Sequence, residues 1–90
     1  MSDTSKKKLL EFPCLFPLKA IGRNADGFQE IVVEIVRRHV PDLPDHAVTT
    51  RASAGGKYIS VTATFVAASQ EQLDAVYYEL SSHEQVMLVL

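Results

Sequence analysis

Side chains suited to nucleophilic or metal chemistry are few in this chain: one cysteine, Cys14, and three histidines, His39, His46 and His83. A metal site normally requires ligands at short fixed spacings, such as two histidines three or four residues apart, and no such pair occurs in the sequence. A single cysteine also excludes an internal disulfide and agrees with a reducing compartment. We therefore expect no catalytic residue, no metal site and no cofactor.

The same four residues have ordinary structural interpretations. His39 continues the apolar stripe of a predicted helix, so we expect it to be partly buried and to interact with the negative end of the helix dipole; a functional role is the alternative. His46 and His83 fall in predicted loops and are expected to be solvated. Cys14 follows a proline and is expected to behave as a small hydrophobic residue.

A turn before the first predicted helix is the candidate for small-molecule binding, and it contains Arg23, Asn24, Asp26 and Gly27. The helix is expected to begin near Asp26, so its first backbone N–H groups carry partial positive charge and could receive a carboxylate, with Arg23 beside it. The alternative, which we favour, is that the Asp26 side chain caps those N–H groups and the turn is purely structural.

A β-hairpin is predicted at Gly55-Gly56, because two glycines supply the positive φ angles of a tight two-residue turn. If Ala54 pairs with Lys57, the register places apolar side chains on one face of the sheet and polar ones on the other. The polar face is predicted to be an interaction surface that includes Lys19, Arg51, Tyr58, Ser60 and Thr62.

A small domain of the α+β class is predicted to position these side chains. Apolar positions at helical spacing predict one helix from about Asp26 until Pro41 and a second from Ser69 to Leu80, each opened by a capping box. Strands are expected on either side of each helix, which gives the order β-α-β-β-α-β. This order predicts a ferredoxin-like plait, an α+β fold in which a four-stranded antiparallel sheet carries both helices on one face.

The limits of the outer strands and of the domain follow from the positions of prolines and glycines and from the alternation of polar and apolar residues. The first strand is expected to span Leu15–Ile21 and to end at Gly22, with Phe16, Leu18 and Ala20 facing inward. The last strand is expected to span Val86–Leu90 and to be tucked into the sheet. Residues 1–8 are polar and are predicted to be a disordered lead-in, which leaves residues 9–90 as a single domain.

Composition limits the partners. The 90 residues are 47% hydrophobic and 22% charged with a formal net charge of −2, which argues against a partner bound mainly through phosphates. Tyr58 is the one aromatic residue predicted on the polar face, so RNA binding there is the weaker alternative. No segment has the length of an apolar membrane span, and the apolar run after the lysines at 6–8 is too short for a secretion signal, so a cytoplasmic location is expected.

Six short motifs between Leu10 and Leu90 carry a family resemblance. They are LEFP at 10–13, FPLK at 16–19, GKYISV at 56–61, QL at 72–73, YYEL at 77–80 and VL at 89–90. In this order and spacing they resemble the YbeD-like family of small bacterial proteins of unknown function. The resemblance implies a fold similar to the ACT domain, the small-molecule-sensing module of many enzymes of amino-acid metabolism.

The resemblance also implies a regulatory or protein-interaction role without catalysis, and a weak link to lipoate metabolism. In ACT domains a D-x-P-G pattern lies at the effector loop; here Gly27 matches, while Asn24 and Asp26 replace the aspartate and the proline. The partners expected are a small-molecule effector or another protein, with a homodimer as one form. Val33 and Tyr78 lie off the buried stripes of their helices and could contribute to such a contact.

Overall fold

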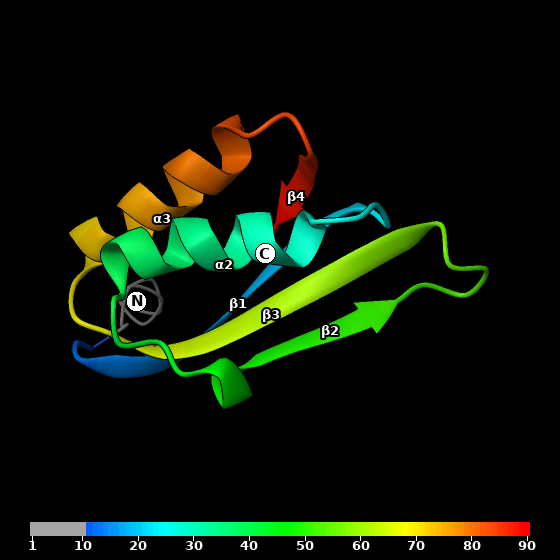
Figure 1. Cartoon of the computed structure of the whole chain (residues 1–90). Helices are drawn as coiled ribbons and strands as arrows, with labels where there is room; N and C mark the ends of the chain where they lie inside the picture. Colours follow the sequence, from blue (N-terminus) through cyan, green and yellow to red (C-terminus); the bar gives the residue numbers. More distant parts are fainter. Residues whose placement is uncertain (1–10) are drawn as a thin grey trace, which may run out of the picture.

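The computed structural model describes residues 11–90 and contains four strands, two α-helices and one short 3-10 helix. In chain order they are β1 Cys14–Arg23, α2 Phe28–His39, η1 Asp45–Ala47, β2 Val48–Ala52, β3 Tyr58–Ala67, α3 Gln70–Ser82 and β4 Val86–Val89. The strands form one antiparallel sheet in the order β2-β3-β1-β4, and both helices cover the same face of it (Figure 1). The predicted ferredoxin-like plait is confirmed. The lead-in expected at residues 1–8 lies outside the described residues.

The core lies between the helices and the covered face of the sheet. Leu18 and Ala20 of β1 are fully buried there, as the alternation predicted, and the stripe of α2 buries Phe28, Val32, Ile35 and Val36. Leu73, Val76 and Leu80 are the matching residues of α3. Tyr77 packs edge-on against Phe16 at the margin of this core, and burial raises the pKa of its phenol above 10.0.

The hairpin has the predicted register but a longer loop. Thr49 lies opposite Thr62 and Arg51 opposite Ser60, as expected. However, the strands stop at Ala52 and Tyr58, and the turn closes through a hydrogen bond that the Gly56 N–H donates to the Ser53 carbonyl. Gly55 and Gly56 both have positive φ, 88° and 72°. The two-residue turn is therefore wrong, while the register survives because the extra residues are added symmetrically.

Gly22 does not end the first strand, which continues to Arg23. A Cβ at Gly22 would clash with the Gln85 carbonyl oxygen and with the ring of Phe28, so a glycine allows both to approach the strand. The register between β1 and β4 also shifts between Ile21 and Gly22. This glycine therefore marks a bulge and a close approach, and not a strand end.

The two helices begin differently, although both were predicted to open with a capping side chain. In α3 the Ser69 hydroxyl accepts a hydrogen bond from the Gln72 N–H at 3.1 Å, so that prediction is confirmed. In α2 the N-cap is Gly27, with a φ of 86°, and no side chain caps the helix. The prediction that Asp26 caps α2 is wrong, because the left-handed glycine turns the chain between Asp26 and the helix.

β4 lies at the edge of the sheet and is not tucked inside it. Its partner on one side is β1, and nothing in residues 11–90 pairs with the other side. Val86 and Val89 point toward the helices, whereas Met87 and Leu88 are exposed. No helix in this part of the chain is both long and apolar enough to cross a membrane.

Candidate functional site

The face of the sheet opposite the helices is not covered by any described residue, and we refer to it as the open face. Its side chains come from alternate positions of the four strands, and the strand register fixes which of them are neighbours. One row contains Leu88, Ile21, Ser60 and Arg51, and the next contains Leu90, Lys19, Thr62 and Thr49. All five residues predicted for the interaction surface therefore lie on this face.

Polar side chains occupy the half of the open face formed by β2, by most of β3 and by Lys19 of β1. A hollow of about 390 Å³ opens there, and its polar lining includes Lys19, Arg51, Tyr58 and Ser60. Neither Lys19 nor Arg51 forms an ion pair with a described residue. The register places no aspartate or glutamate on the described strands of this face. The hollow is thus a cationic surface with hydroxyl groups around it.

Apolar side chains occupy the other half, along β1 and β4 and at Val66 near the end of β3. Leu15 and Val66 form a direct cross-strand pair, and Leu88 and Leu90 lie beside β1, with all four at least half exposed to solvent. Four of the six large hydrophobic residues most exposed in residues 11–90 are therefore on one face. Exposed apolar groups gathered in this way are typical of interaction sites.

The sequence reasoning missed this apolar half. The signal was present in β1, because Leu15 has the same parity as Lys19 and must point to the same face. Leu88 and Leu90 were missed because β4 was expected inside the sheet.

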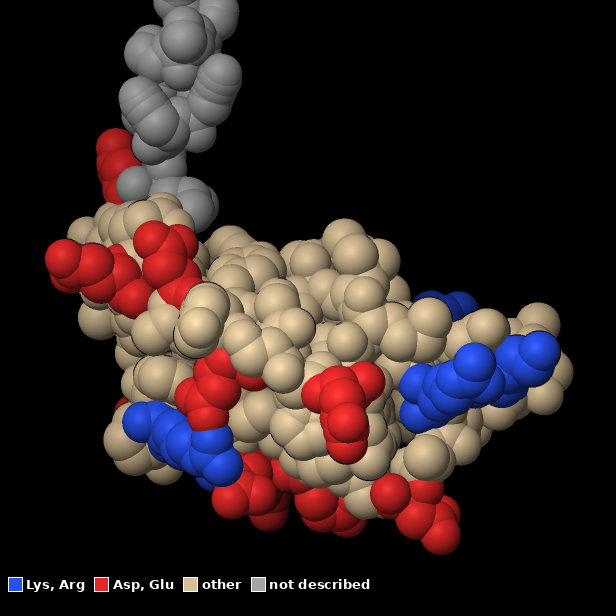
Figure 2. Space-filling view, turned by 90° about the horizontal axis from the view of Figure 1, so that it is seen from above, with Lys and Arg blue, Asp and Glu red and all other residues tan. Residues whose placement is uncertain are grey.

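Charge is distributed unequally between the two sides of the molecule. Acidic side chains are spread over the helical layer, as the view from that side shows (Figure 2). Glu30, Glu34, Glu71 and Asp74 are exposed residues of α2 and α3. The open face therefore carries cations in a molecule whose formal net charge is −2.

The predicted effector turn is held in place by the hairpin. The Asn24 side-chain amide donates to the Gly56 carbonyl at 3.0 Å, and the Asn24 N–H donates to the Lys57 carbonyl at 2.9 Å. Arg23, Asp26 and Gly27 are exposed, and Gly27 provides the backbone conformation at the helix start. The four residues are adjacent in space, and Asn24 has a structural role; effector binding by this turn stays a prediction.

His39 forms part of a polar contact between the two helices. Its Nε2 lies 2.8 Å from Glu79 Oε1, and the other oxygen of that carboxylate is bound by Arg38. The Gln72 side-chain amide donates to the His39 carbonyl at 2.8 Å and so satisfies one of the carbonyl groups left without a partner at the C-terminal end of α2. His39 is partly buried, as predicted. Among residues 11–90 no group of three or more metal-ligating side chains is present.

Comparisons with known proteins agree with this fold. A family model described as a protein of unknown function, DUF493, matches residues 7–90. The chain is 46% identical to a UPF0250 protein from Chromobacterium violaceum, over the full length of both chains. It is also 46% identical to a UPF0250 protein from Neisseria gonorrhoeae, over 96% of this chain and 94% of that one. A solution structure of HP0495 from H. pylori, 18% identical, has a TM-score of 0.70 over 100% of this chain and 94% of the other, which supports the fold.

Proposed function

We propose, from the premise that this chain belongs to the DUF493 family of proteins of unknown function, that it is a non-catalytic interaction module whose open face binds an acidic surface of another protein. This family corresponds to the YbeD-like proteins that the sequence resembles, so that prediction is confirmed. The observation that carries the proposal is the open face itself, where an apolar stripe lies directly beside two cations that have no ion-pair partner among the described residues.

The physical reason is complementarity. Apolar groups that leave water on binding supply favourable free energy, while cations without acidic neighbours favour a partner of negative charge. Lys19 and Arg51 lie in adjacent rows, and the hydroxyls of Ser60 and Thr62 lie between them. A partner with carboxylates next to leucine-like side chains would satisfy both halves at once.

RNA is the competing ligand, because cations and hydroxyls also bind phosphates. Sheet-based RNA recognition stacks bases on several aromatic side chains, and the open face offers one, Tyr58, at the hairpin end. The centre of the face holds Ser60, Thr62 and Thr64 in place of aromatic residues. The acidic protein surface is therefore the better match.

Chemical-shift mapping of the labelled protein tests the proposal. A short peptide of alternating glutamate and leucine should shift the amides of residues around Lys19, Arg51 and Ser60, and the lysine–leucine peptide of equal length should not. Replacing both Lys19 and Arg51 with alanine should lower the affinity for the acidic peptide by about three- to tenfold. Lys57→Ala, which removes a cation from the hairpin tip, is the matched control and should have a smaller effect.

Three outcomes would contradict the proposal. If the acidic peptide changes the chemical shift of no open-face amide, the proposed site is ruled out. Single-stranded oligouridine that binds more tightly than the peptide, with the affinity lost in Tyr58→Ala, establishes RNA as the ligand. A concentration-dependent dimer whose shifts map to the open face shows that a second copy of the chain occupies it.

A further inference from the structure

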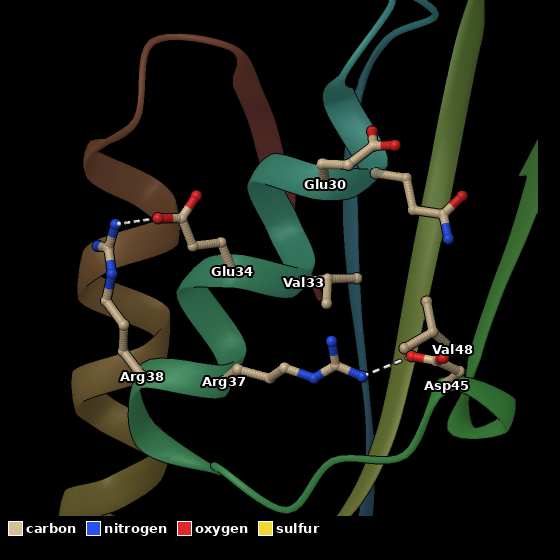
Figure 3. A pocket seen from close by; sticks show the side chains of 8 residues that line it. Glu30, Val33, Glu34, Arg37, Arg38, Asp45 and Val48 are labelled. Carbon is tan, nitrogen blue, oxygen red and sulfur yellow. Dashed lines mark hydrogen bonds and ion pairs between the residues drawn. The ribbon is translucent and has the colours of Figure 1, made fainter.

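The geometry points to a second binding site, independent of the open face: we propose that an extended peptide segment of a partner protein adds to the free edge of β2 and places its side chains in the groove between β2 and α2. The groove has a volume of about 620 Å³ and lies on the helix side of the sheet. Its walls come from α2 on one side and from η1 and β2 on the other (Figure 3).

The edge of β2 offers unpaired backbone groups. Ser53 donates to the Tyr58 carbonyl, and antiparallel pairing alternates, so Arg51 and Thr49 also face β3. Thr50 and Ala52 must therefore point their N–H and C=O groups away from the sheet. The Val48 N–H is already used, since it donates to the Asp45 carbonyl.

The edge of β2 is only partly protected against pairing with another strand. Natural edges are blunted by short length, charged side chains, proline, a bulge or a covering segment. The strand VTTRA at 48–52 is short and carries one charge, Arg51, which points to the open face. It contains no proline or lysine, its pairing with β3 has no register shift, and Thr50 and Ala52 are exposed. The opposite edge differs, because Pro17 removes an N–H where β1 extends past the end of β4.

The groove fits the side chains of an added strand. Side chains of a strand paired to β2 alternate between the two faces, so every second one would enter the groove. The groove walls include Val33 of α2 and Val48 of β2, both partly exposed, so they favour small apolar side chains (Figure 3). This contact would also account for Val33, which lies off the buried stripe of α2.

Charge sets the direction and the chemistry of the peptide. Arg37 bonds to Asp45 at 2.7 Å and to the Leu43 carbonyl, so it crosses from α2 to η1 and closes the groove near Val48 (Figure 3). Glu30 lines the groove nearer the start of α2 and forms no ion pair with a described residue. Because α2 runs antiparallel to β2 (Figure 1), Glu30 lies toward the Ala52 end. A strand antiparallel to β2 would thus place a basic residue first and valine-sized residues after it.

The test uses a capped synthetic peptide, lysine–threonine–valine–threonine–valine–threonine. Its lysine would lie opposite Ala52 and its first valine opposite Thr50. Titration into the labelled protein should shift amides of β2 and of the groove side of α2. The matched control peptide is methylated on the nitrogen of the first valine, which removes the N–H donated to Thr50, and it should bind about five- to tenfold more weakly.

Two protein variants provide independent readouts. Thr50→Pro removes an edge N–H that points away from β3, so the sheet should persist and peptide affinity should fall by about five- to tenfold. Glu30→Gln should weaken binding of the lysine peptide. A peptide with glutamine in place of lysine should bind the parent protein and the Glu30→Gln variant equally. Lys19→Ala, on the open face but in β1 and away from the β2 edge, should leave this binding unchanged, which separates the groove from the proposed function.

Equal binding of the methylated and unmethylated peptides would overturn strand addition. So would shifts confined to the open face, or the absence of any shift at the highest soluble peptide concentration. A protein that is dimeric, becomes monomeric in Thr50→Pro and binds no peptide would assign the β2 edge to a second copy of the chain.

Discussion

Gly22 is the one glycine of the four in this chain at which neighbouring atoms leave no room for a side chain. The Gln85 carbonyl and the buried ring of Phe28 occupy the space where a Cβ would lie, and neither is the far end of a flexible chain. Overpacking of this kind costs about 1–3 kcal/mol. Gly22→Ala should lower the free energy of unfolding by that amount, measured by urea denaturation followed by circular dichroism.

Gly55→Ala is the comparison for that variant. Gly55 has a φ of 88° but no atom near its missing Cβ, so alanine there incurs backbone strain alone, worth about 1 kcal/mol. A loss at Gly22 no greater than the loss at Gly55 would show that Phe28 and Gln85 can shift, and that the close approach does not constrain the fold.

Tyr77 makes the free energy of unfolding depend on pH in the alkaline range. Burial raises the pKa of its phenol in the folded state above 10.0, the value of an exposed tyrosine. The contribution of the neutral phenol is therefore fully present below pH 10 and is lost as the pH rises through the folded-state pKa. Tyr77→Phe should lose less stability than the parent protein above pH 10, measured as the shift of the urea midpoint. Tyr78→Phe, at a neighbouring position that is 77% exposed, should follow the parent.

At the scale of single elements, the two helices begin with similar sequences, but only α3 has a side-chain cap. Alanine at the two capping positions is therefore expected to have different effects on stability. The Ser69 hydroxyl caps α3, so Ser69→Ala should cost about 1 kcal/mol of unfolding free energy. Asp26 caps nothing in α2, so Asp26→Ala should change it by less than about 0.5 kcal/mol. Thermal and urea unfolding measure both. Equal losses would mean that Asp26 does cap α2 in solution.

Local rules predicted most elements and failed where several elements meet. Alternation placed Leu18 and Ala20 in the core, and the hairpin glycines fixed the pairing of Arg51 with Ser60, because both signals lie within a few residues. Gly22 was misread because its reason for being glycine is Phe28 and Gln85, which approach from other elements.

The candidate sites divide in the same way. The polar half of the open face followed from the register of one hairpin, so Lys19, Arg51 and Ser60 were placed together correctly. The groove beside α2 was not predicted, because it depends on where a helix lies relative to a short edge strand. Neither the length of β2 nor the position of α2 above the sheet is encoded in local periodicity.

At the scale of the whole molecule, the fold offers two surfaces of different chemistry on opposite sides of one sheet. The helix side carries an acidic layer and a groove that ends at an unpaired strand edge (Figures 2 and 3). The open face carries cations and an apolar stripe. Because the sheet separates them, a ligand on one side would leave the proposed site on the other side accessible.

The separation of the two faces can be tested within one strand. Leu18 is fully buried against the helices, whereas Leu15, three residues earlier in β1, points to the open face and is 69% exposed. Leu18→Ala removes buried methyl groups and leaves a cavity, so it should cost about 2–5 kcal/mol, a large part of the ~5–15 kcal/mol that stabilises a typical domain. Leu15→Ala should change the unfolding free energy by less than about 0.5 kcal/mol, because its side chain is largely in water in both states.

Binding of a hydrophobic dye by the folded protein supplies the second readout of this pair. Leu15→Ala should reduce it, since the Leu15–Val66 pair is part of the exposed apolar stripe. Val66→Thr, the β-branched replacement opposite Leu15, should act in the same direction and preserve the strand. A stability loss in Leu15→Ala comparable to that in Leu18→Ala would show that Leu15 is buried in solution. The open face would then not be available as an interaction surface.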